Sequence, residues 1–239
     1  MIRTTISHIE YSPSKEVTFV RCKPEDNFTF KEGQFMMVAS DHIHEWLGKP
    51  LKKPYSIATT NQELQEKGSI GFVVKKVREW FMSEYLTDTI QVGDVLHLQW
   101  PVGHMIDTWA NNAYLLASVG SGLSPMVSLY NHIVASNPTA KIANLFWERF
   151  HAHVLPSVEE TFSLSSDHVH NQLFLSKEEN LPKNYTQWHI QTGLESALAF
   201  LNTKEISVFI CGKPEMVDDF RSQLTAYWVD PKNIKFEKY

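Results

Sequence analysis

Cysteine is scarce in this sequence, which has only two, Cys22 and Cys211, in 239 residues. A plant-type iron–sulfur cluster needs four cysteine ligands, so the chain cannot hold such a cluster by itself. A disulfide between the two thiols would require an oxidising compartment, and the N-terminal residues carry no secretory signal. We therefore expect both cysteines to be reduced and the protein to be cytoplasmic.

Two other features are missing, an excess of basic residues and a long apolar run. Lys and Arg number 22 against 27 Asp and Glu, a formal net charge of −5, so the basic surface typical of nucleic-acid-binding proteins is absent. No apolar run reaches the ~20 residues that cross a bilayer. These absences predict no nucleic-acid partner and no membrane insertion. The 43% hydrophobic content is ordinary for a globular protein with a substantial core.

Short strands separated by turn signals are the pattern of the first hundred residues. Segments rich in β-branched and aromatic residues predict strands at 16–22, 34–39, 55–60, 70–77 and 95–100. Apart from a short helix at 78–86, no convincing helix interrupts them. This regularity is typical of an all-β barrel or sandwich.

Beyond residue 110 the pattern changes to apolar strands alternating with helices. The expected strands are 113–119, 141–147, 172–176 and 206–212, and the expected helices are 125–136 and 214–228. Such alternation is typical of a parallel α/β sheet. We place the boundary in the aperiodic segment 101–112 and expect a β domain at 1–106 and an α/β domain at 107–239.

A glycine-rich loop follows the first strand of the α/β half. Gly120 and Gly122 would give a tight turn, and Pro125 would open the helix, where the N–H that proline lacks has no intrahelical partner. Ser124 is then the expected N-cap. Such a loop aims backbone N–H groups at one spot, which suits a phosphate. An ordinary glycine turn explains the loop equally well on this evidence alone.

The segment KKPYSIATT (52–60) favours the phosphate interpretation. Lys53, Tyr55 and Ser56 on one strand would meet a phosphate, a flat ring and a polar ring edge respectively. A tyrosine in a barrel strand usually packs in the core, so this segment is also weak by itself.

Six motifs in order carry a stronger signal, and together they resemble the ferredoxin–NADP reductase family. They are FKEGQFMMV (30–38), KPYSIAT (53–59), GDVLHLQWPVG (93–103), VGSGLSPM (119–126), FICGKPEMV (209–217) and FEKY (236–239). The resemblance covers essentially the whole chain. It implies an N-terminal antiparallel FAD-binding β-barrel followed by a C-terminal parallel-sheet nucleotide-binding domain, with FAD and NADP or NAD as cofactors.

In the barrel, the resemblance implies that FAD binds at an Arg-x-Tyr-Ser signature. Lys53 replaces the arginine and would contact the pyrophosphate as a point charge, Tyr55 would pack on the isoalloxazine, and Ser56 would lie near its N5 edge. The full set of barrel residues assigned to cofactor binding is Lys53, Pro54, Tyr55, Ser56, Val74, Lys75 and Ser83.

The surroundings of Ser83 depart from the family pattern. Ser83 is expected to cap a phosphate, but the preceding glycines of the family are replaced by Glu79, Trp80 and Phe81. The Gly-Pro-x-Gly that follows becomes WPVG (100–103). These changes imply a reshaped adenine end or weaker retention of FAD.

In the α/β half, the resemblance assigns the loop at 119–126 to the pyrophosphate of NAD(P)H and the Cys-Gly turn at 211–212 to the nicotinamide pocket. The residues assigned to this cofactor are Gly120, Gly122, Ser124, Pro125, Ser176, Lys177, Cys211, Gly212 and Tyr239. Ser176 and Lys177 stand where NADPH users bind the 2′-phosphate, whereas Glu148 would disfavour a second phosphate. Both cofactors therefore stay open, and we expect NADPH.

The ending Glu237-Lys238-Tyr239 resembles the Glu-x-Tyr ending of the family. It implies that Tyr239 stacks on the flavin where nicotinamide must come, and that Glu237 supports the transfer. Ser56 and Cys211 complete the candidate catalytic set. Otherwise a C-terminal tyrosine is ordinarily a frayed end, and a buried cysteine is a small core residue.

Histidines and paired glutamates outside these motifs match no zinc spacing, so we predict no metal site and solvent-exposed side chains. They are His151, His153, His168, His170, Glu159, Glu160, Glu178 and Glu179.

The activity implied is an FAD-dependent oxidoreductase that passes electrons from NAD(P)H through FAD to a separate one-electron carrier. The partner would be ferredoxin or flavodoxin, or the oxygenase component of a larger system. Two alternatives stay open, a reductase of free flavin or quinone, and a non-catalytic partner-binding subunit that lost FAD through the changes at 79–81 and 100. The pattern makes no prediction of the oligomeric state.

Overall fold

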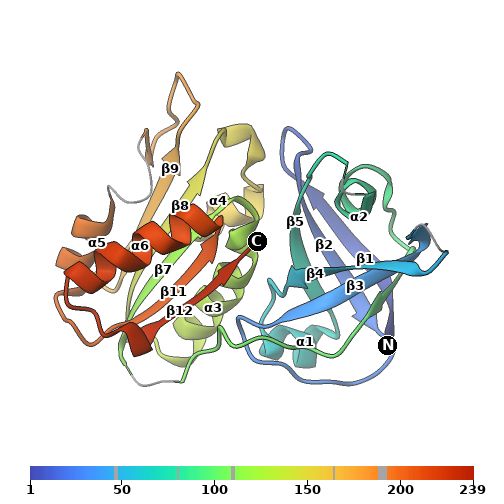
Figure 1. Ribbon diagram of the computed structural model, residues 1–239, viewed down its shortest axis with the longest axis horizontal. Helices are drawn as coiled ribbons and strands as arrows, with labels where there is room; N and C mark the ends of the chain where they lie inside the picture. The colour runs from blue at the N-terminus through green and yellow to red at the C-terminus, as the bar shows by residue number, and fades with distance from the viewer. Residues whose placement is uncertain (46–47, 80, 109–110, 164, 188–192) are drawn as a thin grey trace.

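The computed structural model describes residues 1–45, 48–79, 81–108, 111–163, 165–187 and 193–239. Two units lie side by side, an antiparallel β unit and an α/β unit, and the C-terminus lies between them (Figure 1). The predicted division at residues 106 and 107 falls between the last strand of the first unit and the first strand of the second. The boundary itself stays a prediction.

The first unit is a six-stranded antiparallel sheet in the order β4-β3-β6-β1-β2-β5. Its edge strands meet at a bridge between Ile57 and Phe72, next to a 2.8 Å bond from the Ala58 N–H to the Gly71 carbonyl, which closes the barrel. The strands are β1 (Ile2–Tyr11), β2 (Val17–Pro24), β3 (Phe35–His44), β4 (Pro50–Ser56), β5 (Ile70–Lys75) and β6 (Val95–Leu98).

Three helical segments accompany the barrel, and one of them was not predicted. α1 (Asn61–Lys67) begins with a capping box between Thr60 and Glu63 and ends at Gly68 in the left-handed conformation. Both signals are local and are present in the sequence. The predicted helix at 78–86 is shorter than expected, α2 (Phe81–Glu84), and continues as a π-helix at Tyr85–Thr89.

The second unit is a six-stranded parallel sheet in the order β10-β9-β8-β7-β11-β12. The strands are β7 (Ala113–Val119), β8 (Lys141–Glu148), β9 (Val169–Leu175), β10 (Tyr185–Thr186), β11 (Ser207–Gly212) and β12 (Ile234–Lys238). Every residue of β7 is buried, which is typical of a parallel strand covered on both faces.

Helices cover both faces of the parallel sheet. One apolar cluster joins the sheet to α3 (Leu123–Ser136) and α4 (Pro156–Phe162), and another joins it to α5 (Leu194–Leu201) and α6 (Pro214–Ala226). Short 3₁₀ turns lie at Gly120–Gly122, His151–His153 and Pro231–Asn233. The fold therefore confirms the expected antiparallel barrel followed by a parallel α/β sheet. No described helix is long and apolar enough to cross a membrane.

The start of α3 differs from the prediction. The helix begins at Leu123 with Gly122 at the N-cap, so Ser124 and Pro125 are its second and third residues. The expectation that Ser124 is the N-cap is wrong. Pro125 is tolerated at this position because the first four N–H groups of a helix lack intrahelical partners.

The hydroxyl of Ser124 instead joins the two units. It donates to the Ser56 carbonyl at 2.5 Å and accepts the Val73 N–H at 3.2 Å. One turn later the Ser128 hydroxyl donates to the Thr59 carbonyl at 2.7 Å. The apolar cluster on this face of the sheet also includes barrel residues, so α3 is packed against both units.

Candidate functional site

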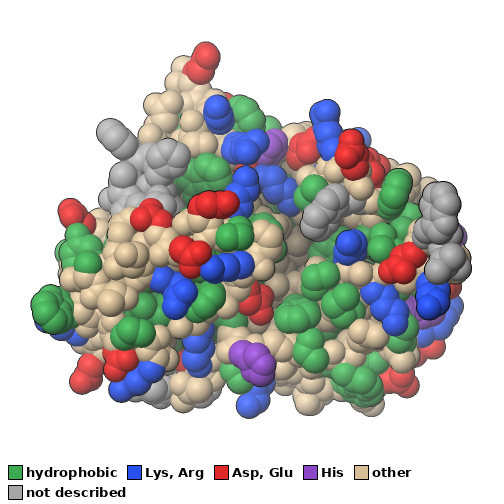
Figure 2. Space-filling model, viewed as in Figure 1, with side chains coloured by type: hydrophobic (Ala, Val, Ile, Leu, Met, Phe, Trp, Pro, Cys, Tyr) green, Lys and Arg blue, Asp and Glu red, His purple; other side chains and the backbone are tan. Residues whose placement is uncertain are grey.

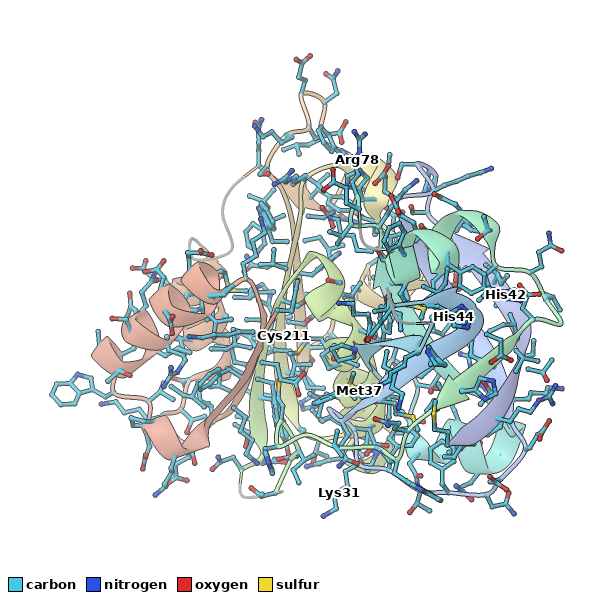
Figure 3. All side chains as sticks on the ribbon, turned by 45° about the vertical axis from the view of Figure 1, so that its right-hand side comes forward. Lys31, Met37, His42, His44, Arg78 and Cys211 are labelled. Carbon is cyan, nitrogen blue, oxygen red and sulfur yellow. The ribbon has the colours of Figure 1, made fainter. Side chains whose placement is uncertain are left out.

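The carboxyl ends of the parallel strands meet barrel strands β4 and β5 at the junction of the two units. Figure 2 shows Lys and Arg side chains gathered over the upper part of this junction. In Figure 3, Cys211 lies in the α/β unit near the junction, while His42 and His44 lie further across the barrel. The candidate residues are described here from the centre of the junction outward.

Ser56 and Glu237 meet although 181 residues separate them in the sequence. The Ser56 hydroxyl donates to Glu237 Oε2 at 3.3 Å. Burial raises the pKa of the Glu237 carboxyl to about 7, and the bond from Ser56 offsets part of that rise. The junction therefore holds a carboxyl group that can take up or release a proton near neutral pH.

Cys211 lies beside Glu237, because β11 and β12 pair these two residues in register. Its thiol is free and only 2% exposed. Burial raises the pKa of the thiol well above its ordinary value, and the neighbouring Glu237 charge adds to the rise. The thiol is thus neutral and presents a small apolar surface.

Gly122 packs directly against β11. A Cβ at this position would lie 2.2 Å from the Cys211 carbonyl oxygen, so only glycine fits. Gly120, at φ +55°, has a left-handed backbone that glycine adopts without strain. The two glycines therefore answer different demands, close packing for Gly122 and backbone conformation for Gly120.

Tyr239 is anchored on the glycine loop by its hydroxyl. The hydroxyl accepts the Gly122 N–H at 2.9 Å and donates to the Val119 carbonyl oxygen. Burial raises the pKa of this hydroxyl, although the residue as a whole is 54% exposed. A frayed end is excluded for Tyr239. Its stacking on a flavin stays a prediction.

Lys75 and Glu148 form an ion pair across the junction. Lys75 Nζ lies 2.6 and 2.5 Å from the two carboxylate oxygens of Glu148. Burial alone would raise the pKa of Glu148, but the bonds from His153, Lys75 and the Arg149 N–H outweigh it and hold the pKa low. The sequence analysis missed this pairing. The signal available was an acidic residue at the end of an apolar strand.

The barrel residues of the FAD signature lie along β4. Tyr55 packs against the barrel core, and burial raises the pKa of its hydroxyl. Lys53 is half-buried and Pro54 is exposed. Val74 is 1% exposed and belongs to the apolar core of the barrel, so its side chain does not reach a ligand, contrary to its assignment to cofactor binding.

Ser83 is engaged within its own turn. Its hydroxyl accepts the Val77 N–H at 3.1 Å and donates to the Val77 carbonyl at the same distance. It closes the turn before α2, where we expected a phosphate cap. Glu79 has the left-handed backbone that a glycine would favour, at φ +66°, and Trp80 lies outside the described residues.

Ser176 and Lys177 lie next to the backbone of β8. The Ser176 N–H donates to the Glu148 carbonyl at 3.2 Å, and the Lys177 N–H donates to the Arg149 carbonyl at 2.9 Å. The Glu148 carboxylate is directed to Lys75 and is 2% exposed. The positive charge of Lys75 offsets that of Glu148, which weakens the expected repulsion of a second phosphate at Ser176.

Several histidines and glutamates predicted to be solvent-exposed are partners of one another. His151 Nε2 lies 2.9 Å from Glu159 Oε1, and the Tyr185 hydroxyl donates to the same oxygen at 3.2 Å. His153 Nδ1 lies 3.4 Å from Glu148, and Glu178 accepts the His151 N–H. The prediction of solvent-exposed side chains is wrong for His151, His153 and His170, which are half-buried, and is confirmed for His168, Glu160 and Glu179. Among the described residues no three metal-ligating side chains gather into a candidate metal site.

Comparison with known proteins adds the family. The family model described as "Oxidoreductase FAD-binding domain" matches residues 5–106, and the one described as "Oxidoreductase NAD-binding domain" matches residues 116–222. The toluate 1,2-dioxygenase electron transfer component of Pseudomonas putida is 24% identical over 196 residues, which cover 80% of this chain and 55% of that protein. The chain spans about half the length of the first curated relatives that it matches.

Two solved structures share the fold over nearly the whole chain. A ferredoxin NADP+ reductase from Neisseria gonorrhoeae with bound FAD and NADP gives a TM-score of 0.78 at 19% identity, covering 99% of this chain and 97% of that one. The ferredoxin reductase in carbazole 1,9a-dioxygenase gives 0.81 at 18% identity, covering 99% and 68%. With an FAD-binding domain, an NAD-binding domain and this fold in order, the chain belongs to the ferredoxin–NADP reductase family of oxidoreductases.

Proposed function

We propose that this chain takes a hydride from NADPH or NADH and passes the electrons singly to a separate carrier. The observation that supports this most directly is the Ser56–Glu237 bond with Cys211 alongside, because it unites polar groups of both units at one point. FAD, when bound, would accept two electrons together and release them one at a time. The protein residues would bind and orient the two cofactors and exclude water from the site.

The junction fits FAD at its flavin end. Ser56 would offer its hydroxyl to the ring edge, and Glu237, with a pKa near 7, would hold or release a proton nearby. Tyr55 would pack against the ring, and Lys53 would contact the pyrophosphate. Because Ser83 is bonded within its own turn, the pyrophosphate contact would rest on Lys53 more than the family pattern implies.

The glycine loop and the ends of β8 and β9 would hold the nicotinamide dinucleotide. Gly120 and Lys75 would lie against the pyrophosphate, Ser176 and Lys177 against the adenosine end, and Cys211 and Gly212 beside the nicotinamide. The Lys and Arg side chains over the junction (Figure 2) suit both phosphate-bearing cofactors. The exposed Lys177 favours NADPH over NADH, because it offers a positive charge for the additional phosphate.

The proposed acceptor is a one-electron carrier, either ferredoxin, flavodoxin or an oxygenase component. Two cysteines, both buried and in different units, cannot ligate a cluster. A relative is named as the electron transfer component of a dioxygenase, which is consistent with an oxygenase partner. Reduction of free flavin or quinone is the second candidate.

The test begins with FAD titration followed by anaerobic mixing with NADPH and with NADH. We expect about one FAD per chain, loss of flavin absorbance on mixing, and turnover with ferricyanide. Lys53→Ala should weaken FAD binding by ~1.5–3 kcal/mol, through loss of a charged hydrogen bond. Absence of FAD binding at micromolar flavin would refute the enzyme and favour the non-catalytic subunit. Turnover with free FMN or quinone exceeding that with any one-electron carrier would favour the second candidate.

A further inference from the structure

The ion pair between Lys75 and Glu148 is unequal in how its partners are held. Glu148 is 2% exposed, and besides Lys75 it accepts the Arg149 N–H at 2.7 Å and lies 3.4 Å from His153 Nδ1. Lys75 is 23% exposed and sits at the end of β5 on a flexible side chain. Glu148 is therefore fixed in place, and Lys75 is the partner that can move.

Lys75 also lies over the glycine loop. A Cβ placed on Gly120 would be 3.6 Å from Lys75 Cδ, 3.7 Å from Lys75 Nζ and 3.6 Å from the Tyr239 hydroxyl. A group resting on the Gly120 backbone would thus touch the lysine that Glu148 now holds. Lys75 has three N–H donors, and both oxygens of Glu148 already lie within hydrogen-bond distance of its Nζ. An anion at Gly120 must draw the ammonium away from this close contact to bind it fully, so the carboxylate and such a group compete for Lys75.

Resting on the proposed function, we propose that Glu148 is a specificity-determining residue that competes with the dinucleotide pyrophosphate for Lys75. In the free enzyme Lys75 pairs with Glu148. When a pyrophosphate binds at Gly120, Lys75 turns to it and leaves Glu148 to the Arg149 N–H and His153. The carboxylate thereby lowers the affinity for ligands that carry a pyrophosphate and leaves adenosine monophosphates unaffected.

This role is separate from holding the two units together. Ser124, Ser128 and Ser157 make further hydrogen bonds across the junction, to Ser56, Thr59 and Glu10. Loss of the ion pair leaves these bonds in place. Glu148→Gln keeps the shape and an oxygen for the Arg149 N–H while removing the charge, so it is the variant of choice.

Asp88→Asn is the matched control. Lys76 follows Lys75 in the sequence and pairs with Asp88 at 2.6 Å. Lys76 lies just beyond the end of β5, and its ammonium is held at Asp88, whereas the lysine atoms next to Gly120 are those of Lys75. Asp88→Asn therefore removes one carboxylate charge from a neighbouring lysine without freeing the lysine that lies over the loop. The probes are ADP-ribose, which has the pyrophosphate but no nicotinamide, and AMP, which has neither. Their dissociation constants are measured on the FAD-loaded protein by calorimetry.

We expect Glu148→Gln to bind ADP-ribose about tenfold more tightly, a change worth ~1.4 kcal/mol, and AMP within twofold of the original protein. Asp88→Asn should leave both constants unchanged, and Lys75→Met should abolish the gain when combined with Glu148→Gln. Equal or weaker ADP-ribose binding by a Glu148→Gln variant with normal FAD content and melting temperature would overturn the competition. Failure of the unaltered protein to bind FAD or ADP-ribose would instead refute the proposed function.

Discussion

At the scale of single residues, the junction holds a carboxyl group, that of Glu237, whose charge changes near neutral pH. Burial raises its pKa from the ordinary 4.5 to about 7. Between those two values the folded chain binds more protons at this group than the unfolded chain does. Its contribution therefore makes the protein less stable as the pH rises from 4.5 to 7, and the loss is complete above 7.

Glu237→Gln should remove this pH dependence, because glutamine resembles the protonated acid at every pH. We expect the variant and the original protein, both without added FAD, to have similar unfolding free energies near pH 4.5. Above pH 7 the variant should be the more stable by up to about 3 kcal/mol. Denaturant unfolding across pH 4.5–8 measures the difference. A constant difference over this range would show that Glu237 titrates normally.

Tyr239 offers two separable contributions, a ring and a hydroxyl. In Tyr239→Ser, nicotinamide no longer has to displace a ring that stacks on the flavin, a contact worth ~0.5–1.5 kcal/mol. NADP+ or NAD+ should therefore bind more tightly, and mixing either one with reduced enzyme should produce a long-wavelength absorption band. Tyr239→Phe should leave nicotinamide binding unchanged but lower stability by about 1 kcal/mol, because the Gly122 N–H loses its partner. Identical spectra and affinities in all three proteins would refute the stacking.

At the scale of elements, the two glycines of the loop have different roles, Gly122 in packing and Gly120 in the proposed ligand binding. Gly122→Ala should destabilise the α/β unit by ~1–3 kcal/mol, as overpacked sites do, because its Cβ meets the Cys211 carbonyl. Gly120→Ala has room for its Cβ and should cost only about 1 kcal/mol of backbone strain.

The two variants should therefore differ in kinetics. Gly120→Ala should raise the KM for NAD(P)H while FAD content stays unchanged, since its methyl group lies between Lys75 and Tyr239. Steady-state turnover and thermal melting of both variants give the comparison. An unchanged KM in Gly120→Ala would show that no ligand rests on that backbone.

Sequence patterns predict a strand or helix well where all its side chains are buried, and poorly where polar residues interrupt the apolar pattern. β7 begins and ends at the predicted residues because every side chain in it is buried. β1 (IRTTISHIEY) escaped prediction because it buries polar Thr4 next to exposed positions. α1 escaped because it buries only Leu64. Its capping box and terminal glycine were the signals to use.

The residues of the candidate site likewise divide into those that the sequence predicts and those that it does not. The motifs alone were enough to assign Ser56, Cys211, Glu237 and Tyr239 to one site, because each motif lies at the end of a strand. The partners of Glu148 could not be predicted, since Lys75 and His153 approach it from separate elements. Pairings of this kind depend on how two units pack and leave no periodic trace in the sequence.

At the scale of the whole molecule, Ser124 tests how firmly the units are joined. Ser124→Ala would leave the Ser56 carbonyl and the Val73 N–H without their bonds. We expect a loss of about 2–3 kcal/mol, as for buried groups left unsatisfied, and a broader calorimetric transition as the units unfold less cooperatively. Ser136→Ala on the same helix, whose hydroxyl bonds only within α3, is the control. A single sharp transition with unchanged stability would show that the bonds of Ser124 do not help to join the units.

The path of the chain also orders its synthesis. Ser56 lies in β4, early in the barrel, while Glu237 belongs to β12, the final strand of the parallel sheet. Domains fold as they leave the ribosome, the N-terminal one first. A nascent chain can thus complete its barrel long before β12 has been made, and during that interval it carries Ser56 without Glu237 or Tyr239. Chains interrupted before residue 234 would lack Glu237 and Tyr239, so translation to β12 is itself a requirement for forming the complete site.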